Sequence, residues 1–196
     1  MSQDFGNHHR RSTRLKGYDY SQDGAYFFTV CTQDRECLFG DVVDGEMQLN
    51  LAGRMVQAVW DDIPSFYPGV ETDAFVVMPN HIHAIIIVLG SVGATPRGHP
   101  CHGRLDSGQP RGVAPTLSLS DVVHRFKTMT TKRYSDGVRQ SGWLAYRRRL
   151  WQRNYYDHIN RDERSLARIR QYIVTNPMRW EIDHENPNAN HTDTRG

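Results

Sequence analysis

"VVMPNHIHAIII", residues 76–87, places two histidines one residue apart inside an otherwise apolar stretch. Apolar runs flank the Met-Pro-Asn sequence at 78–80, and neither run is long enough for a helix. The pattern therefore predicts a hairpin, or a sharply bent pair of strands, over residues 72–89. Because successive side chains of a strand point to opposite faces, His81 and His83 are expected on one face, about 7 Å apart.

Patterns on either side of this hairpin predict further strands and helices. Aromatic and β-branched residues favour strands, and apolar residues at four-residue spacing indicate helices. Before the hairpin we expect a strand at 25–33, a turn at 44–45 between two short extended pieces, and a helix at 51–66 capped by Asn50. After it we expect a helix at 118–134 started by Ser118 or Ser120, a strand at 149–159, and a helix at 160–176 with a capping box of Asn160 and Glu163.

This order of elements predicts the fold class. Strand, helix, strand, strand, helix, strand and a final helix correspond to a ferredoxin-like β-α-β-β-α-β core of the α+β class, with an antiparallel sheet and one C-terminal helix added. We expect a basic N-terminal arm at 1–17, one domain at 18–182 with a flexible insertion at 90–116, and a loose polar tail at 183–196. Such a fold hosts many functions, so the function has to be argued from particular residues.

Composition indicates an ordinary globular protein. Of the 196 residues, 38% are hydrophobic and 23% are charged. The longest apolar run is too short to span a membrane. The three cysteines are scattered without CxxC spacing, which predicts reduced thiols and a cytoplasmic protein.

Positive charge is concentrated in three places, although the net charge is only +2. Such clusters permit a face for a polyanion such as nucleic acid, and a solvated surface is an equally good explanation. The candidate DNA contacts are Arg10, Arg11 and Arg14 in the N-terminal arm, Arg125, Lys127, Lys132 and Arg133 on the second helix, and Arg147 and Arg148 before the last strand. Trp151, Tyr155 and Tyr156 can stack on unpaired bases, although core packing is the commoner fate of such residues.

Four residues carry candidate chemistry. His81 and His83 can share a metal ion or a phosphate oxygen, and two satisfied polar residues at a strand end are the alternative. Tyr172 and Asn176 lie four residues apart, and hence on one face of the last helix. Tyr172 is a candidate nucleophile and Asn176 offers an oxygen ligand. Packing of Tyr172 and helix capping by Asn176 are the alternatives for this second pair.

Taken together, these motifs resemble a known family. "MPNHIH" at 78–83 and "LWQRNYYDHINRDERSLARIRQYIVTNPMRW" at 150–180 are similar to the REP-associated branch of the single-tyrosine HUH transposases, which are IS200/IS605-like. The similarity extends over residues 15–182 apart from the insertion. It implies that His81 and His83 are metal ligands and that Tyr172 is the nucleophile. It places Asn176 where the insertion-sequence members carry a glutamine ligand.

The resemblance implies a reaction and its partners. Single-stranded DNA would be cleaved and rejoined with Mg²⁺ or Mn²⁺ as cofactor, through a 5′-phosphotyrosine and a free 3′-OH. Imidazole ligands also suit Zn²⁺, whereas Mg²⁺ prefers oxygen and Mn²⁺ accepts both. The implied substrate is a hairpin of a palindromic repeat with an adjacent single strand. The REP-associated branch further implies a monomer rather than a dimer, acting on DNA of the nucleoid.

Three other functions stay open on the sequence. A domesticated protein that binds repeat hairpins without cleaving them would not require His81, His83 and Tyr172. A relaxase-like nuclease tends to use three histidines, and the HxH pair has no third histidine in such a motif. An RNA-binding ferredoxin-like domain would need an RNP1-like pattern, which residues 25–33 match only faintly. Tyr155 and Tyr156 are rival nucleophiles by residue type, but they precede the helix that carries the family's tyrosine.

Overall fold

The computed structural model describes residues 18–89, 118–160 and 162–189. Its centre is an antiparallel four-stranded sheet in the order β4-β5-β1-β6. The strands are β1 (Gly24–Cys31), β4 (Val70–Val77), β5 (His81–Val88) and β6 (Tyr156–Asn160). Together with the helices between them, these strands make the β-α-β-β-α-β core, so the predicted fold class is confirmed.

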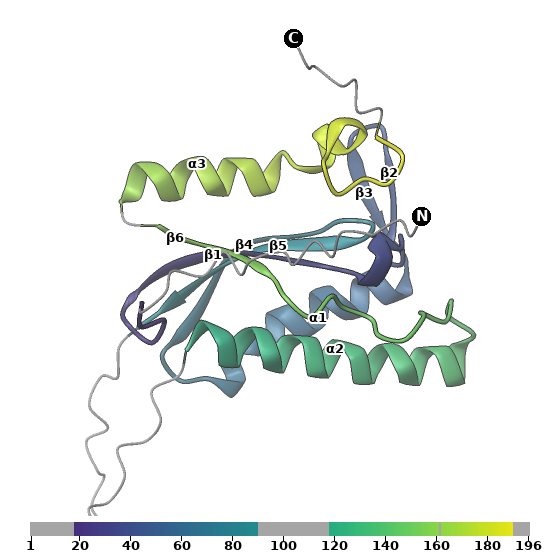
Figure 1. Ribbon diagram of the computed structural model, residues 1–196, viewed down its shortest axis with the longest axis horizontal. Coiled ribbons are helices and arrows are strands. Elements are labelled where there is room, and N and C mark those ends of the chain that lie inside the picture. The colour runs from purple at the N-terminus through teal and green to yellow at the C-terminus, as the bar shows by residue number, and fades with distance from the viewer. Residues whose placement is uncertain (1–17, 90–117, 161, 190–196) are drawn as a thin grey trace, which may run out of the picture.

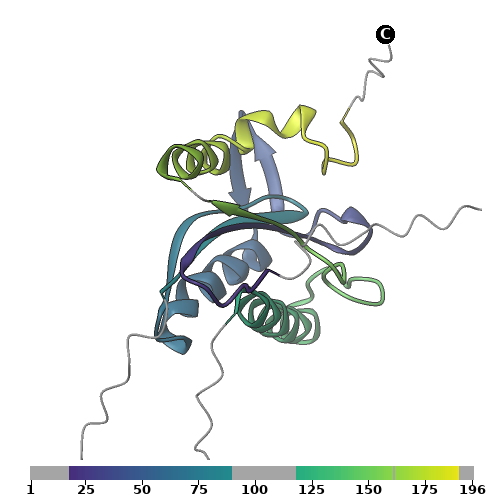
Figure 2. The same ribbon diagram turned by 60° about the vertical axis from the view of Figure 1, so that its left-hand side comes forward.

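Helices cover both faces of this sheet (Figure 1, Figure 2). α1 (Leu51–Phe66) and α2 (Leu119–Ser141) lie against one face, and α3 (Glu163–Val174) lies against the other. The 3-10 helices η1 (Gln33–Arg35) and η2 (Pro177–Ile182) follow β1 and α3, and β2 (Gly40–Val43) pairs with β3 (Glu46–Leu49) as a separate hairpin. Within the residues that the structure describes, no helix combines the length and apolar character needed to cross a membrane.

β5 contributes side chains to two hydrophobic cores. One set of alternating residues packs with α1 and α2 in the larger core: Ile82, Ala84 and Ile86. Ile85, on the opposite face of the strand, belongs to a smaller core under α3 together with Phe27, Leu166 and Ile173. The odd-numbered histidines share the face of Ile85, because side chains alternate along a strand. The alternation therefore directs both imidazoles toward α3.

Each of the last two helices differs from the prediction in at least one of its ends. α2 starts at the predicted cap, where Ser118 and Asp121 form a capping box, but it continues to Ser141. Gly142 ends it in the left-handed conformation (φ 66°), a backbone geometry that glycine adopts without strain. The cap of α3 is Asp162 rather than Asn160, because the Asp162 carboxylate accepts the hydrogen bond from the backbone nitrogen of Ser165.

The predicted strand at 149–159 is much shorter in the structure. Only Tyr156–Asn160 pairs with β1, and Trp151 makes a single bridge with Thr32. The Lys127 ammonium explains the difference, because it donates to the carbonyl oxygens of residues 152–154 at 2.9, 3.3 and 3.3 Å. These carbonyls are therefore directed toward α2 and not into a ladder.

Residues 183–186, expected in a loose tail, are packed against the body of the protein. Asn186 is buried, and its Nδ2 atom donates to the carbonyl oxygen of Trp180 at 2.8 Å. Glu185 pairs with Arg35 at 2.9 Å, and its carbonyl oxygen accepts a hydrogen bond from Asn80. These anchors are polar, and hydrophobic periodicity does not detect them. The expected arm at 1–17 and the whole of the expected insertion at 90–116 lie outside the described residues.

Candidate active site

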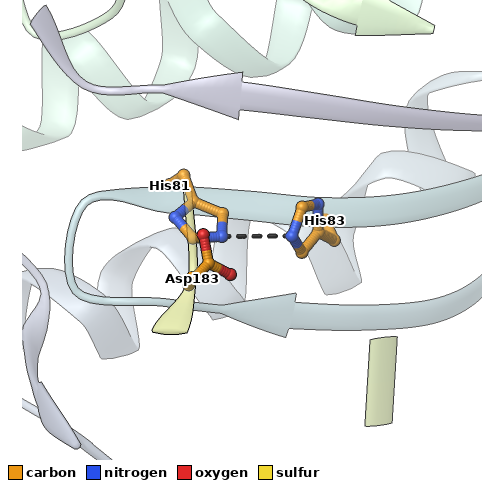
Figure 3. Close-up of side chains that lie close together, drawn as sticks. All are labelled: His81, His83 and Asp183. Atoms are coloured by element: carbon orange, nitrogen blue, oxygen red, sulfur yellow. Dashed lines mark hydrogen bonds between the residues drawn. The ribbon is translucent and has the colours of Figure 1, made fainter. Parts of the chain in front are cut away.

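The two histidines lie side by side on β5, as predicted (Figure 3). Their Nε2 atoms are 3.1 Å apart, and the side chains of His81 and His83 are 0% and 4% exposed. Two atoms bound at right angles to one metal ion, each at about 2.1 Å, lie about 3 Å apart. The spacing of these nitrogen atoms therefore fits two adjacent ligands of one cation.

The second ring nitrogen of each histidine has a hydrogen-bonding partner. His81 Nδ1 lies 2.8 Å from Asn80 Oδ1, an acceptor whose own amide nitrogen donates to the carbonyls of Arg35 and Glu185. His83 Nδ1 lies 2.8 Å from the Thr29 hydroxyl, which can donate or accept. A proton on Nδ1 leaves the lone pair on Nε2, the form that binds metal. Because Asn80 Oδ1 can only accept, it keeps the proton of His81 on Nδ1 and leaves Nε2 free to bind metal. The Thr29 hydroxyl is compatible with the same tautomer of His83 but does not impose it.

α3 places the predicted nucleophile against this pair. The Tyr172 hydroxyl is 3.2 Å from His83 Nε2, and its ring packs edge-on against Phe27. Tyr172 is 37% exposed and lines a cleft that opens beside the site. Asn176, one turn further, is 1% exposed, and its Oδ1 atom has no well-formed hydrogen bond within the described chain. A buried oxygen without a partner is costly, and a cation in the site would satisfy it.

Burial shifts the proton affinities in this site. It lowers the pKa of His81 to about 3, an effect that the nearby Arg35 charge increases and Asn176 opposes. Burial also holds the pKa of His83 well below its ordinary value, with His81 adding to the shift. Burial raises the pKa of Tyr172, and the carboxylate of Asp183 raises it further. The site therefore keeps both imidazoles neutral, and it disfavours the phenolate unless positive charge is supplied.

Sequence analysis missed one residue of the site, Asp183. Its carboxylate and the two imidazoles offer ligand atoms that all lie within 4.8 Å of one another (Figure 3). Oδ2 of Asp183 accepts a hydrogen bond from Asn176 Nδ2 at 3.3 Å. The only signal in the sequence is a carboxylate a short distance after Tyr172, in a polar stretch without periodicity. The path of the chain after η2 brings it to the histidines.

A cleft of about 1050 Å³ opens beside the site and includes His83, Tyr172 and Asn176 in its lining. Arg149, Arg153 and Arg179 also line it, as do the aromatic side chains of Tyr155 and Tyr156. Cationic side chains interspersed with aromatic rings are the surface by which proteins bind single-stranded nucleic acid. Arg149 belongs to the arginine run at 147–149 that was expected to contact phosphates, whereas Arg153 and Arg179 were not predicted as DNA contacts.

The predicted DNA contacts fall in different surroundings. Arg10, Arg11 and Arg14 lie outside the described residues, and Arg147 and Arg148 are exposed beside Arg149. The basic residues of α2 are across the sheet from Tyr172, because α2 and α3 cover opposite faces. Several have protein partners: Lys127 with three carbonyls, Lys132 with Asp136, Arg133 with Asp62, and Arg125 over the ring of Phe66.

The three candidate stacking residues differ in burial. Trp151 is 4% exposed, and its indole nitrogen donates to Thr130 Oγ1 at 2.8 Å, so it packs in the core. Tyr155 packs edge-on against Phe28 and lies under the Lys127 ammonium. Tyr156 is 47% exposed and lines the cleft. Tyr156 is therefore the aromatic residue best placed to stack on a base.

Comparisons with known proteins found two relatives of this chain in sequence. No protein-family model matches it. A Haemophilus influenzae protein described only as uncharacterized is 42% identical over 178 residues, covering 91% of this chain and 93% of that protein. A putative REP-associated tyrosine transposase of Haemophilus influenzae is 24% identical over 164 residues, covering 82% of this chain and 74% of the relative.

A solved structure of a transposase shares the fold of this chain. The structure of a REP-associated tyrosine transposase bound to a REP hairpin matches with a TM-score of 0.52 and 18% identity, over 85% of this chain and 73% of that chain. The protein thus has the fold of a REP-associated tyrosine transposase, and the resemblance stated from its motifs is confirmed. The chain belongs to the same family as the Haemophilus influenzae protein of 42% identity.

Proposed function

We propose that this protein binds hairpin DNA of a palindromic repeat, and that it cleaves and rejoins the adjacent single strand with Tyr172 as nucleophile. One observation carries the proposal. The Tyr172 hydroxyl lies 3.2 Å from His83, which is itself paired with His81, at a cleft lined by arginines. The relative whose solved structure has this fold is bound to a REP hairpin, which supports the choice of substrate.

The proposed cofactor is Mg²⁺ or Mn²⁺, held by His81, His83 and Asn176. The facing Nε2 atoms and the orphaned amide oxygen fit such an ion. When bound, the cation polarises the scissile phosphate and supplies positive charge beside Tyr172. Asn80 and Thr29 keep the imidazoles oriented toward it through their Nδ1 atoms.

In the proposed reaction, Tyr172 attacks phosphorus in line with the leaving 3′ oxygen. The bond from the phenolic oxygen to phosphorus forms, and the bond from phosphorus to the 3′ oxygen breaks. The phenolic proton is lost to solvent in the open cleft, and the 3′ oxygen takes one up. The 5′-phosphotyrosine keeps the phosphoester linkage, so a 3′-OH of another strand can reverse the step and join new ends.

The DNA contacts that fit this site are those of the cleft. We assign the single strand to Arg149, Arg153 and Arg179, which can contact phosphates, and to Tyr156, which can stack on a base. The hairpin stem is assigned to Arg147 and Arg148 with the N-terminal arginines. Tyr172, both histidines and Asn176 come from one chain, which supports action as a monomer on DNA of the nucleoid.

The test is incubation of the protein with a labelled hairpin and single-stranded flank from beside its own gene. Denaturing electrophoresis would follow, with Mg²⁺, Mn²⁺ or neither. A covalent protein–DNA band that needs metal, disappears in Tyr172→Phe and persists in Tyr156→Phe is the expected result. Tyr156→Phe is a matched control, because it removes a hydroxyl from the same cleft. Retardation of the hairpin on a parallel native gel, without any covalent band on the denaturing gel, would instead identify a DNA-binding protein and refute the cleavage mechanism.

A further inference from the structure

We propose that Asp183 is a further ligand of the cation, and that residues 183–186 are a strap built into the metal site. The inference rests on the metal site of the proposed function and extends it to a carboxylate from a different part of the chain. The full donor set would be two imidazole nitrogens, one amide oxygen and one carboxylate oxygen. Figure 3 shows the Asp183 side chain beside the two imidazoles of β5.

The distances suit shared coordination. Ligand atoms of His81, His83 and Asp183 all lie within 4.8 Å of one another. Ligands on opposite sides of an ion with bonds of about 2.1 Å are about 4.2 Å apart. The three groups are therefore close to the spacing that one cation requires.

The carboxylate is held in place by both of its oxygen atoms. Oδ1 of Asp183 accepts from the backbone nitrogen of Glu185 at 2.7 Å, and Oδ2 accepts from Asn176 Nδ2 at 3.3 Å. Ligating carboxylates typically have such outer hydrogen-bond partners, which set their orientation. Asn176 links the two oxygen donors, because its nitrogen contacts Asp183 while its buried oxygen stays unpaired.

The strap is anchored to the residue that orients the first histidine. Oδ1 of Asn80 is the partner of His81 Nδ1, and Nδ2 of the same amide donates to the carbonyl of Glu185 at 2.7 Å. Arg35 binds the strap at two points, the Glu185 carboxylate and the carbonyl oxygen of His184. Displacement of the strap would therefore disturb both the carboxylate and the support of His81.

Charge gives a reason for this arrangement. His81, His83 and Asn176 are neutral donors, so they offer a divalent ion no compensating charge in a buried site. Asp183 supplies one negative charge and a hard oxygen donor, the type that Mg²⁺ and Mn²⁺ prefer.

The test is Mn²⁺ binding to the full chain, measured by the electron paramagnetic resonance signal of free Mn²⁺. Asp183→Asn keeps an oxygen to accept from Glu185 while it removes the charge. Glu181→Gln is the matched control, because this exposed carboxylate lies two residues away. We expect Asp183→Asn to weaken Mn²⁺ binding at least about tenfold. The Mn²⁺ affinity of Glu181→Gln should stay within about twofold of that of the wild type. Thermal unfolding would verify that both variants fold.

Two outcomes overturn the assignment. Wild-type affinity in Asp183→Asn refutes the ligand role, and equal losses in both variants refute it in favour of a general charge effect. A His81→Ala, His83→Ala double variant separates this inference from the proposed function. If Mn²⁺ binding requires the histidines but not Asp183, only the inference fails. If the wild type binds Mn²⁺ no better than the double variant, the proposed metal site fails as well.

Discussion

Replacing Thr29 by valine tests how the site prepares His83 for metal. Thr29 is 8% exposed and lies opposite His83 in the pairing of β1 with β5, with its hydroxyl 2.8 Å from Nδ1. When Nε2 binds a cation, the proton must sit on Nδ1, and the Thr29 oxygen is its acceptor. Valine preserves the shape of the side chain and removes that acceptor, so a buried N–H is left unpaired in the metal-bound form.

The size of the effect follows from this single hydrogen bond. Loss of an outer partner typically costs 10- to 100-fold in metal affinity, or about 1.4–2.7 kcal/mol. We expect Thr29→Val to raise the Kd for Mn²⁺ by that factor. The free energy of unfolding without metal should fall by less, about 1 kcal/mol, because neutral His83 can shift its proton to Nε2 and donate to His81.

Isothermal titration calorimetry with Mn²⁺ measures the affinity, and urea denaturation in the presence of a chelator measures stability. Thr29→Ser is the matched control, since it keeps the hydroxyl, and it should bind Mn²⁺ within about threefold of the wild type. Unchanged Mn²⁺ affinity in Thr29→Val would refute the view that Thr29 supports the metal-binding tautomer of His83.

Three further predictions concern stability and DNA binding. Lys127→Met removes the donor to the carbonyls of residues 152–154, so it should lower the free energy of unfolding in urea by about 1.5–3 kcal/mol. The control Lys132→Met, at an exposed lysine, should change this free energy by under about 0.5 kcal/mol, and equal effects of the two substitutions would contradict the structural role of Lys127. Without metal, the free energy of unfolding should decline as the pH falls from about 6.5 toward 3, because the unfolded chain protonates His81 and His83 while burial keeps both imidazoles neutral in the folded chain. The free energy of unfolding should change with pH by up to about 1.4 kcal/mol per pH unit for each histidine. A free energy of unfolding that is independent of pH between about pH 7 and 4.5 would refute this reasoning. Arg153→Gln should reduce the salt dependence of single-strand binding, measured by fluorescence anisotropy. The slope of the logarithm of the binding constant against the logarithm of the salt concentration should fall in magnitude by about 0.7, and an unchanged slope would exclude a phosphate contact.

Much of the candidate site was predictable because it follows from local periodicity. Alternation along residues 81–88 is enough to place His81 and His83 on one face, and helical spacing is enough to place Tyr172 beside Asn176. Both predictions need only the repeat of a strand or a helix, which neighbouring residues set. The β-α-β-β-α-β order was predictable for the same reason, since its elements carry regular apolar patterns.

The errors arose where polar contacts between distant segments decide the conformation. The strand predicted at 149–159 is mostly irregular, because a lysine on α2 binds its carbonyl oxygens. The cap of α3 is a local exception, in which Asp162 rather than Asn160, two positions before it, accepts from the backbone nitrogen of Ser165. The basic residues of α2 were predicted to contact DNA phosphates; the helix covers the face of the sheet opposite α3, and its contact with DNA stays a prediction. Charge along a sequence does not indicate which face of a sheet a helix will cover.

The sequence by itself determined the class of fold, the face shared by the histidines and the helical face shared by Tyr172 and Asn176, because each depends on short-range spacing. The choice of Tyr172 as candidate nucleophile came from the resemblance of its motif to a known family. Only the tertiary structure decided that Tyr172 and His83, 89 residues apart, lie within 3.2 Å. It alone brought Asp183 to the same point, through a strap held by Asn80 and Arg35. These contacts depend on how α3 and the chain after η2 cross the sheet. That crossing is set by the packing of Phe27, Ile85, Leu166 and Ile173 and by buried polar pairs between remote residues.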